Sequence, residues 1–166
     1  MIVDSILVPT DFSATSEAAL HYAAQMALTF GARLYLLHVP GKTGEHFEAS
    51  FPIGQFDTAA GERLLSFLTK EELERLRPEY VMRVGPPADE IVLYAGMCDA
   101  DLIIMGTHGR SGLAHALMGS VAEQVVRVAP CPVLLVRAPR AAVAEGAGAV
   151  VPPVEKTLGP SSGVMI

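Results

Sequence analysis

The chain has 166 residues, of which 51% are hydrophobic and 18% are charged, and its 18 acidic and 12 basic residues give a formal net charge of −6. This length and apolar content suffice for one ordinary domain with a core that needs neither metal nor disulfide. The acidic balance, without a dense Lys/Arg run, argues against nucleic-acid binding, and no stretch is long and apolar enough to span a membrane. The first ten residues lack a basic segment, which argues against a signal peptide, so we expect a cytoplasmic protein.

The first quarter of the chain predicts a strand, a helix and a second strand. Residues 4–9 form a short β-rich run that ends at a proline, and residues 10–13 form a loop with good capping residues. Apolar residues then recur at helical spacing over residues 18–27, and Gly31 is placed to end that helix. Residues 34–39 are a continuous apolar run, typical of a strand that is buried on both faces.

The next segment predicts a long loop and an interrupted helix. Residues 41–57 are punctuated by Gly and Pro, and a loop of this length is uncommon unless it is functional or mobile. A helical pattern follows over residues 64–76. Thr69 and Glu72 form a capping-box pattern inside it, which predicts a break into two helices near Leu68.

The remaining elements continue the alternation of strands and helices. Residues 80–84 predict the third strand, and a Gly-Pro-Pro turn leads into a helix from residue 88 to about residue 98. Residues 101–105 predict the fourth strand. A Gly-rich loop, a helix through residues 124–128 and a fifth strand at residues 132–136 complete the predicted core.

Five strands with helices between them predict right-handed crossovers and a parallel sheet, which is a doubly wound α/β domain with helices on both faces. In such sheets a ligand binds at the carboxyl ends of the strands, where the strand order reverses. A sheet ordered 3-2-1-4-5 has that point between its first and fourth strands. We expect this domain to span residues 1–138. The Ala/Gly/Pro-rich residues 139–166 would form a C-terminal tail, which is either a flexible terminus or a segment that docks on the domain or on a partner subunit.

The two cysteines, Cys98 and Cys131, stand far from any metal-ligand spacing. We expect both to be small buried core residues in a protein of a reducing compartment.

The Gly-rich loop after the fourth strand has residues that suit a polyphosphate. Gly106 and Gly109 lack a Cβ, so their backbone can approach phosphate oxygens or adopt a positive φ. Gly119 and Ser120 open the next helix, where free N–H groups and the helix dipole favour an anion. Arg110 offers a charged fork to the outer phosphates. The alternative is that the glycines only form the turn between strand and helix.

The loop at the end of the first strand should face this Gly-rich loop across the reversal point. Its Asp11 could bond a ribose hydroxyl, hold a metal ion or cap the following helix. His108 could donate to phosphate or transfer a proton, or it could be a packed ring or a simple ligand contact. No triad with a nucleophile can be assembled from the histidines, so the sequence assigns no catalytic residue.

The spacing of Gly106, two residues, Gly109, nine residues, then Gly119-Ser120 resembles the ATP-binding signature of the universal stress protein family. The resemblance covers residues 2 to about 138. Other stretches that are similar to this family are residues 6–13, 36–39, 84–91 and 129–137.

The resemblance implies an ATP site. Pro9, Thr10 and Asp11 would lie beside adenosine, and the backbone of Val39 would read the adenine edge. Whether Mg²⁺ or Mn²⁺ accompanies ATP, and which residues would hold it, stays open. The other contacts implied are Met105, Gly106, His108, Gly109, Arg110, Gly119, Ser120 and Val121.

The resemblance also implies a homodimer formed through the last strand, which runs from Pro132 to Arg137, and protein partners that the sequence does not identify. The predicted function is that of an ATP-binding regulatory module in the stress response, acting by binding and not by turnover. Gly41-Lys42-Thr43 imitates the end of a P-loop, but Leu36 stands where its first glycine is required, and the Gly-rich loop holds no lysine. Two alternatives stay open: slow ATP hydrolysis, and a module that acts through protein contacts while nucleotide is incidental.

Overall fold

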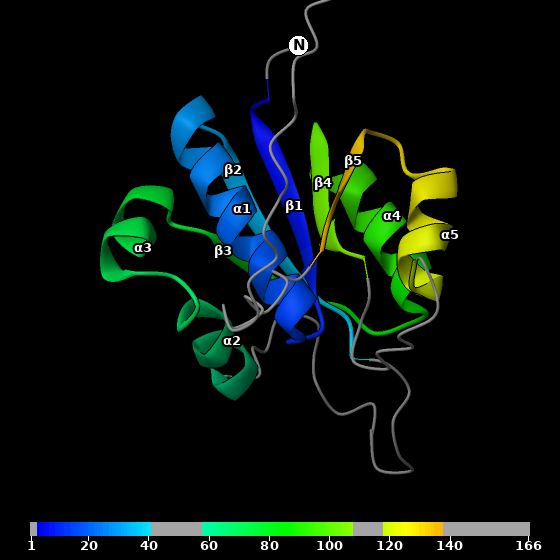
Figure 1. Cartoon of the computed structure of the whole chain (residues 1–166), viewed down its shortest axis with the longest axis horizontal. Coiled ribbons are helices and arrows are strands. Elements are labelled where there is room, and N and C mark those ends of the chain that lie inside the picture. The colour runs from blue at the N-terminus through cyan, green and yellow to red at the C-terminus, as the bar shows by residue number, and fades with distance from the viewer. Residues whose placement is uncertain (1–2, 41–57, 108–117, 138–166) are drawn as a thin grey trace, which may run out of the picture.

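Five strands pair in parallel in the order β3-β2-β1-β4-β5 (Figure 1), which confirms the strand order expected for the doubly wound sheet. The computed structural model describes residues 3–40, 58–107 and 118–137. Residues 41–57 and the tail at 139–166 lie outside these ranges. The strands are β1 (Ser5–Thr10), β2 (Arg33–His38), β3 (Glu79–Met82), β4 (Leu102–Gly106) and β5 (Val133–Val136).

Helices cover both faces of the sheet, as predicted (Figure 1). One face carries α1, α2 and α3, and the other carries α4 and α5. Their bounds are Ala14–Phe30 for α1, Thr58–Leu65 for α2, Lys70–Leu76 for α3, Pro87–Met97 for α4 and Ser120–Val128 for α5.

The side chains of β1 show why the central strands are continuous apolar runs. Ile6 and Val8 are buried in the cluster under α1. Leu7, which lies between them in the sequence, is buried on the opposite face, in the cluster under α4 and α5. Successive side chains of a strand point to opposite faces, so a strand covered on both faces must be apolar at every position. The same alternation in β2 buries Leu36 under α1 and Leu37 under α4 and α5.

Helix α1 begins and ends at residues that are favoured as helix caps. The Ser13 side chain accepts a hydrogen bond from the Ser16 backbone N–H at 3.3 Å and thereby caps the first turn. Gly31 ends the helix in the left-handed region, at φ 70°, and its N–H donates to the Ala27 carbonyl. Glycine adopts this conformation without steric cost, which confirms its predicted role as the helix terminator.

The predicted break after α2 is confirmed. The Thr69 hydroxyl accepts from the Glu72 backbone N–H at 3.2 Å, and the Glu72 carboxylate accepts from the Thr69 N–H at 2.8 Å. This reciprocal capping box satisfies donors that would otherwise be unpaired at the start of a helix. The local pattern therefore starts a new helix, α3, where the apolar periodicity alone would have continued the previous one.

All five strands differ by one or two residues from their expected bounds, and the shifts in β1 and β3 show the physical reason. Strand β1 continues past Pro9 to Thr10, because Thr10 still pairs with His38 of β2. Strand β3 ends at Met82 and not at residue 84, because its partner β2 ends at His38, which is the residue opposite Met82. In both cases the neighbouring strand decides where the element stops.

The expectation that both cysteines are buried core residues is wrong. Cys98 and Cys131 are half-buried and pack against the outside of the cluster under α4 and α5. Burial is nevertheless sufficient to raise the pKa of each thiol above its usual value, because it disfavours the charged thiolate.

Among the residues that the structure describes, no helix is both long enough and apolar enough to cross a membrane.

Candidate functional site

Strands β1 and β4 stop pairing before their carboxyl ends, at the point where the strand order reverses. Their ladder consists of Ile6 opposite Leu102 and Leu7 opposite Ile103, whereas β1 remains paired with β2 as far as Thr10. Strand order reverses between β1 and β4, since the chain extends the sheet from β1 toward β3 on one side and toward β5 on the other. This is the place where open α/β sheets bind ligands.

Pro9 lies in β1 where a missing N–H costs no ladder hydrogen bond. The Ser5 carbonyl accepts from the Asp101 N–H, so the peptide groups of Ser5, and of every second residue after it, face β4. Pro9 therefore faces β4 as well, two residues beyond the last pair that β1 makes with β4. Proline, which has no N–H, is tolerated in this central strand because β4 is no longer paired with it there.

The connection from β1 to α1 is held by short-range hydrogen bonds of its polar side chains. Thr10 is buried, and its hydroxyl donates to Ser16 Oγ at 3.2 Å while accepting from the Phe12 N–H at 3.1 Å. Asp11 Oδ1 accepts from the Ser13 N–H at 3.1 Å. The helix cap is Ser13 itself, so Asp11 shapes the turn that precedes the cap.

The carboxyl end of β4 packs directly against the start of α1. A Cβ placed on Gly106 would lie 2.9 Å from the backbone carbon, Cβ and Oγ1 of Thr15. Gly106 is not among the described glycines with positive φ, so the close approach of Thr15, and not an unusual backbone conformation, requires glycine here. Met105, one residue earlier, is buried on the opposite face.

The Gly-rich loop begins and ends at one point of the fold. The Thr107 N–H donates to the Val136 carbonyl at 2.9 Å, and the Thr107 carbonyl accepts from the Gly119 N–H at 2.7 Å. The last described residue before the loop is thus bonded to the residue that caps α5. The predicted site residues His108, Gly109 and Arg110 lie outside the described residues.

Helix α5 starts without a side-chain cap. Its N-cap is Gly119, which has no side chain to bond the N–H groups of the first turn. Ser120 is exposed and Val121 is half-buried. N–H groups at the positive end of a helix dipole favour an anion, and that Gly119, Ser120 and Val121 contact a phosphate stays a prediction.

The carboxyl end of β2 supplies the remaining predicted residue. Val39 follows directly after the strand and is buried against the α4 and α5 side of the sheet. That its backbone reads an adenine edge stays a prediction. His38, the last residue of β2, lies with Nδ1 2.8 Å from the Thr10 carbonyl, which accepts its hydrogen bond and fixes the ring beside the β1 connection.

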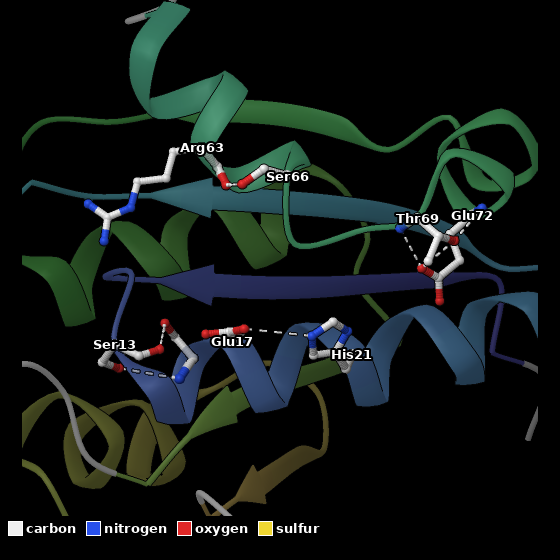
Figure 2. A network of polar contacts seen from close by, with 8 residues as sticks. Ser13, Glu17, His21, Arg63, Ser66, Thr69 and Glu72 are labelled. Carbon is white, nitrogen blue, oxygen red and sulfur yellow. Dashed lines mark hydrogen bonds and ion pairs between the residues drawn. The ribbon is translucent and has the colours of Figure 1, made fainter.

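Most of the predicted site residues therefore lie at one edge of the sheet, the one formed by the carboxyl ends of the strands. Parallel strands end on the same side, and the bond between Thr107 and Gly119 joins the start of α5 to that side. Sequence reasoning missed Thr15 and Arg63, which also lie there. Figure 2 shows the Arg63 side chain extending from α2 toward the carboxyl ends of the neighbouring strands. The predicted residues that the structure brings to this edge are Pro9, Thr10, Asp11, Val39, Met105, Gly106, Gly119, Ser120 and Val121.

The described residues were also considered as metal ligands, because a metal ion accompanying ATP was left open by the sequence. No group of three or more His, Cys, Asp or Glu side chains among those residues could hold a metal ion.

The model of the universal stress protein family matches residues 3–137. The universal stress protein MJ0531 of Methanocaldococcus jannaschii is 35% identical over 148 residues, covering 81% of this chain and 82% of that protein. The solved structure of MJ0577 superimposes with a TM-score of 0.66 at 34% identity, covering 82% of this chain and 97% of that one.

Two of the similar solved structures hold an adenine nucleotide. A universal stress protein in complex with cAMP has a TM-score of 0.58 at 27% identity and covers 84% of this chain and 100% of that one. The universal stress protein of Archaeoglobus fulgidus in complex with dAMP has a TM-score of 0.53 at 26% identity and covers 82% of this chain and 99% of that one.

Proposed function

The chain belongs to the universal stress protein family, and from this premise we propose that it binds an adenine nucleotide, with ATP as its ligand. The proposal rests above all on the start of α5. Its N-cap, Gly119, has no side chain that could cap the first N–H groups, and the Gly119 N–H is bonded to Thr107, which directly follows β4. This arrangement favours a phosphate group. The cAMP and dAMP complexes of two similar proteins support adenine as the base.

The nucleotide would lie across the point where β1 and β4 separate. Its phosphates would meet Gly106 and the residues from Gly119 to Val121, together with His108, Gly109 and Arg110 of the intervening loop. Its adenosine would lie against the Pro9-Thr10-Asp11 segment and Val39. In this arrangement the helix dipole and backbone donors stabilise the negative charge.

The protein would act by binding and not by turnover. The segment from Gly106 to Ser120 contains neither a lysine nor a carboxylate, so it lacks the phosphate-binding lysine and the metal-binding carboxylate that phosphoryl-transfer enzymes use. We infer a cytoplasmic homodimer in which bound ATP orders the loop and alters a surface for protein partners in the stress response. Slow ATP hydrolysis would be a side reaction.

Calorimetric titration of the nucleotide-free chain with ATP, with and without Mg²⁺ or Mn²⁺, tests the proposal. We expect one site per chain, and we expect Gly119→Glu to abolish it, because the new carboxylate would stand where the phosphate should bind. Gly96→Glu is the matched control, since this exposed glycine of α4 has no atom within 4 Å of an added Cβ. Unchanged ATP affinity in Gly119→Glu would contradict the proposed site. Absence of binding at millimolar ATP would favour a module that acts through protein contacts alone.

A further inference from the structure

Three side chains from separate segments meet at the carboxyl ends of β1 and β2. Phe12 comes from the β1–α1 connection, His38 is the last residue of β2, and Arg63 lies on α2. The Phe12 and His38 ring centroids are 4.6 Å apart, and the Arg63 guanidinium carbon lies 4.9 Å from the centroid of the Phe12 ring. These three residues are the arginine–aromatic cluster.

The backbone aims Phe12 at this position. Phe12 has φ 62°, in the left-handed region that bulky residues rarely occupy. Its N–H donates to Thr10 Oγ1, and the Ser13 cap follows immediately. A conformation of this kind persists where surrounding contacts determine it, and such residues concentrate at ligand sites.

The fold also determines where Arg63 lies. The next residue, Leu64, is fully buried in the core under α1, and a Cβ on Gly61 would lie 3.5 Å from the Tyr80 ring of β3. These contacts hold α2 against the sheet with the exposed Arg63 side chain directed toward the strand ends (Figure 2). The ion pairs found within the described ranges do not include Arg63. Its recorded partner there is the Phe12 ring.

The cluster adjoins the segments proposed to hold the nucleoside. Asp11 directly precedes Phe12, and Val39 directly follows His38. By contrast, the start of α5, where the phosphates would lie, is bonded to β4 on the other side of β1. A guanidinium that is planar, charged and rich in donors can stack on a base or bond its polar edge.

We propose that Arg63 is a specificity-determining residue that contacts the nucleoside end of the bound nucleotide. Phe12 packs against the guanidinium, and His38 supports Phe12 from β2. This inference rests on the proposed function and adds to it a contact from α2. It makes adenosine, and not the phosphate chain, the part of the ligand that Arg63 recognises.

The test compares the affinities of Arg63→Ala and Arg63→Gln for adenosine, AMP and ATP, measured by competition with a fluorescent ATP analogue. We expect each variant to lose about tenfold in affinity for all three ligands, because the lost contact is common to them. Arg63→Lys should not restore affinity, since an ammonium is neither planar nor able to stack. Arg33→Ala is the matched control: Arg33 lies 5.6 Å from the Tyr35 ring centroid, at the opposite end of β2, so its loss should leave all three affinities unchanged.

Each other outcome overturns the inference in a distinct way. Unchanged affinity in folded Arg63 variants would make the cluster a packing feature. A loss for ATP without a loss for adenosine would make Arg63 a phosphate contact. Thermal unfolding of each variant separates lost binding from lost structure, and Arg63→Gln retains most of the side-chain volume should the alanine variant unfold. If the unmodified chain bound none of the three ligands, both the proposed function and this inference would be contradicted. If Gly119→Glu abolished binding while the Arg63 variants bound normally, the proposed function would stand and only the Arg63 contact would be contradicted.

Discussion

At position 106 the space available, which is too small for a Cβ, requires glycine. An added Cβ would collide at 2.9 Å with three atoms of Thr15, one of which is backbone carbon. The sequence suggested that glycine here serves a close phosphate. The structure gives a second reason that needs no ligand, because the end of β4 must pass the first turn of α1.

We therefore predict that Gly106→Ala lowers the free energy of unfolding by about 1 to 3 kcal/mol, the usual cost of inserting a methyl group into a packed region. Gly96→Ala is the control, since this exposed helical glycine has nothing within 4 Å of the new Cβ. That change should raise stability by up to about 1 kcal/mol through helix propensity. Urea unfolding of both variants measures the difference, and equal effects would contradict the steric argument.

Residues far apart in the sequence set the environment of other side chains as well. Cys98 and Cys131 look like core residues from composition, yet both lie at the margin of the cluster under α4 and α5. Arg63 has no recognisable motif around it. It reaches the carboxyl ends of the strands because α2 packs over β2 and β3, and no local sequence pattern predicts that packing.

Among the elements, the α2–α3 break is where local sequence was most informative. The Thr69–Glu72 pair is a short-range signal, and it was sufficient to predict the start of α3. The Glu72 carboxylate also accepts from Gln25 Nε2 of α1 at 3.0 Å, so the cap helps to join α3 to α1. The hydrogen bond from the Thr69 backbone is the main cause that holds the pKa of Glu72 below its usual value.

We predict that Thr69→Ala costs about 1 kcal/mol of stability at pH 7, the usual value of a helix cap. A carboxyl group with a lowered pKa contributes stability above its unfolded-state pKa and loses it as pH falls through the folded-state pKa. Thr69→Ala keeps the backbone N–H that lowers this pKa, whereas Glu72→Gln removes the carboxylate, so the difference in stability between the parent chain and Glu72→Gln should shrink on acidification. Chemical denaturation at several pH values measures it, with Thr29→Ala, an exposed change within α1, as the control. A difference between the parent chain and Glu72→Gln that is independent of pH would show that the charged carboxylate does not stabilise the cap.

Strand ends were the elements predicted least well from the sequence. Strand β1 passes through Pro9 because the peptide of Pro9 faces a neighbour that no longer pairs with it. Strand β3 stops where β2 stops. Strand boundaries depend on the partner strand, and that dependence is invisible in the strand's own residues.

At the scale of the whole molecule, the strand order leaves β3 and β5 as the edges of the sheet. Leu134 of β5 is 36% exposed although it is a large apolar residue in a strand. Within the described part of the chain no strand pairs with the outer side of β5, and an edge strand with an exposed leucine is suited to pair with another chain. This supports the proposed homodimer through the last strand.

We predict that Leu134→Glu converts a dimer into a monomer. The two introduced carboxylates, one from each subunit, would be buried in the interface and would repel each other. Light scattering coupled to size-exclusion chromatography measures the mass of the assembly. Leu93→Glu is the control, since Leu93 is 52% exposed but lies on α4 and not on the sheet edge. A dimer that persists in Leu134→Glu would exclude this residue from the interface.

The sequence by itself determined the order of the elements, the parallel sheet with helices on both faces, the helix break at Thr69 and the helix start at Gly119. These features follow from periodicity, capping and the handedness of crossovers, which act over a few residues or constrain connections generally. The tertiary structure alone decided why Gly106 must be glycine, where β1 and β4 separate, and that Phe12 meets Arg63. Each of these depends on the distance between segments far apart in the chain, and a sequence records which residues are present but not the space between the elements that carry them.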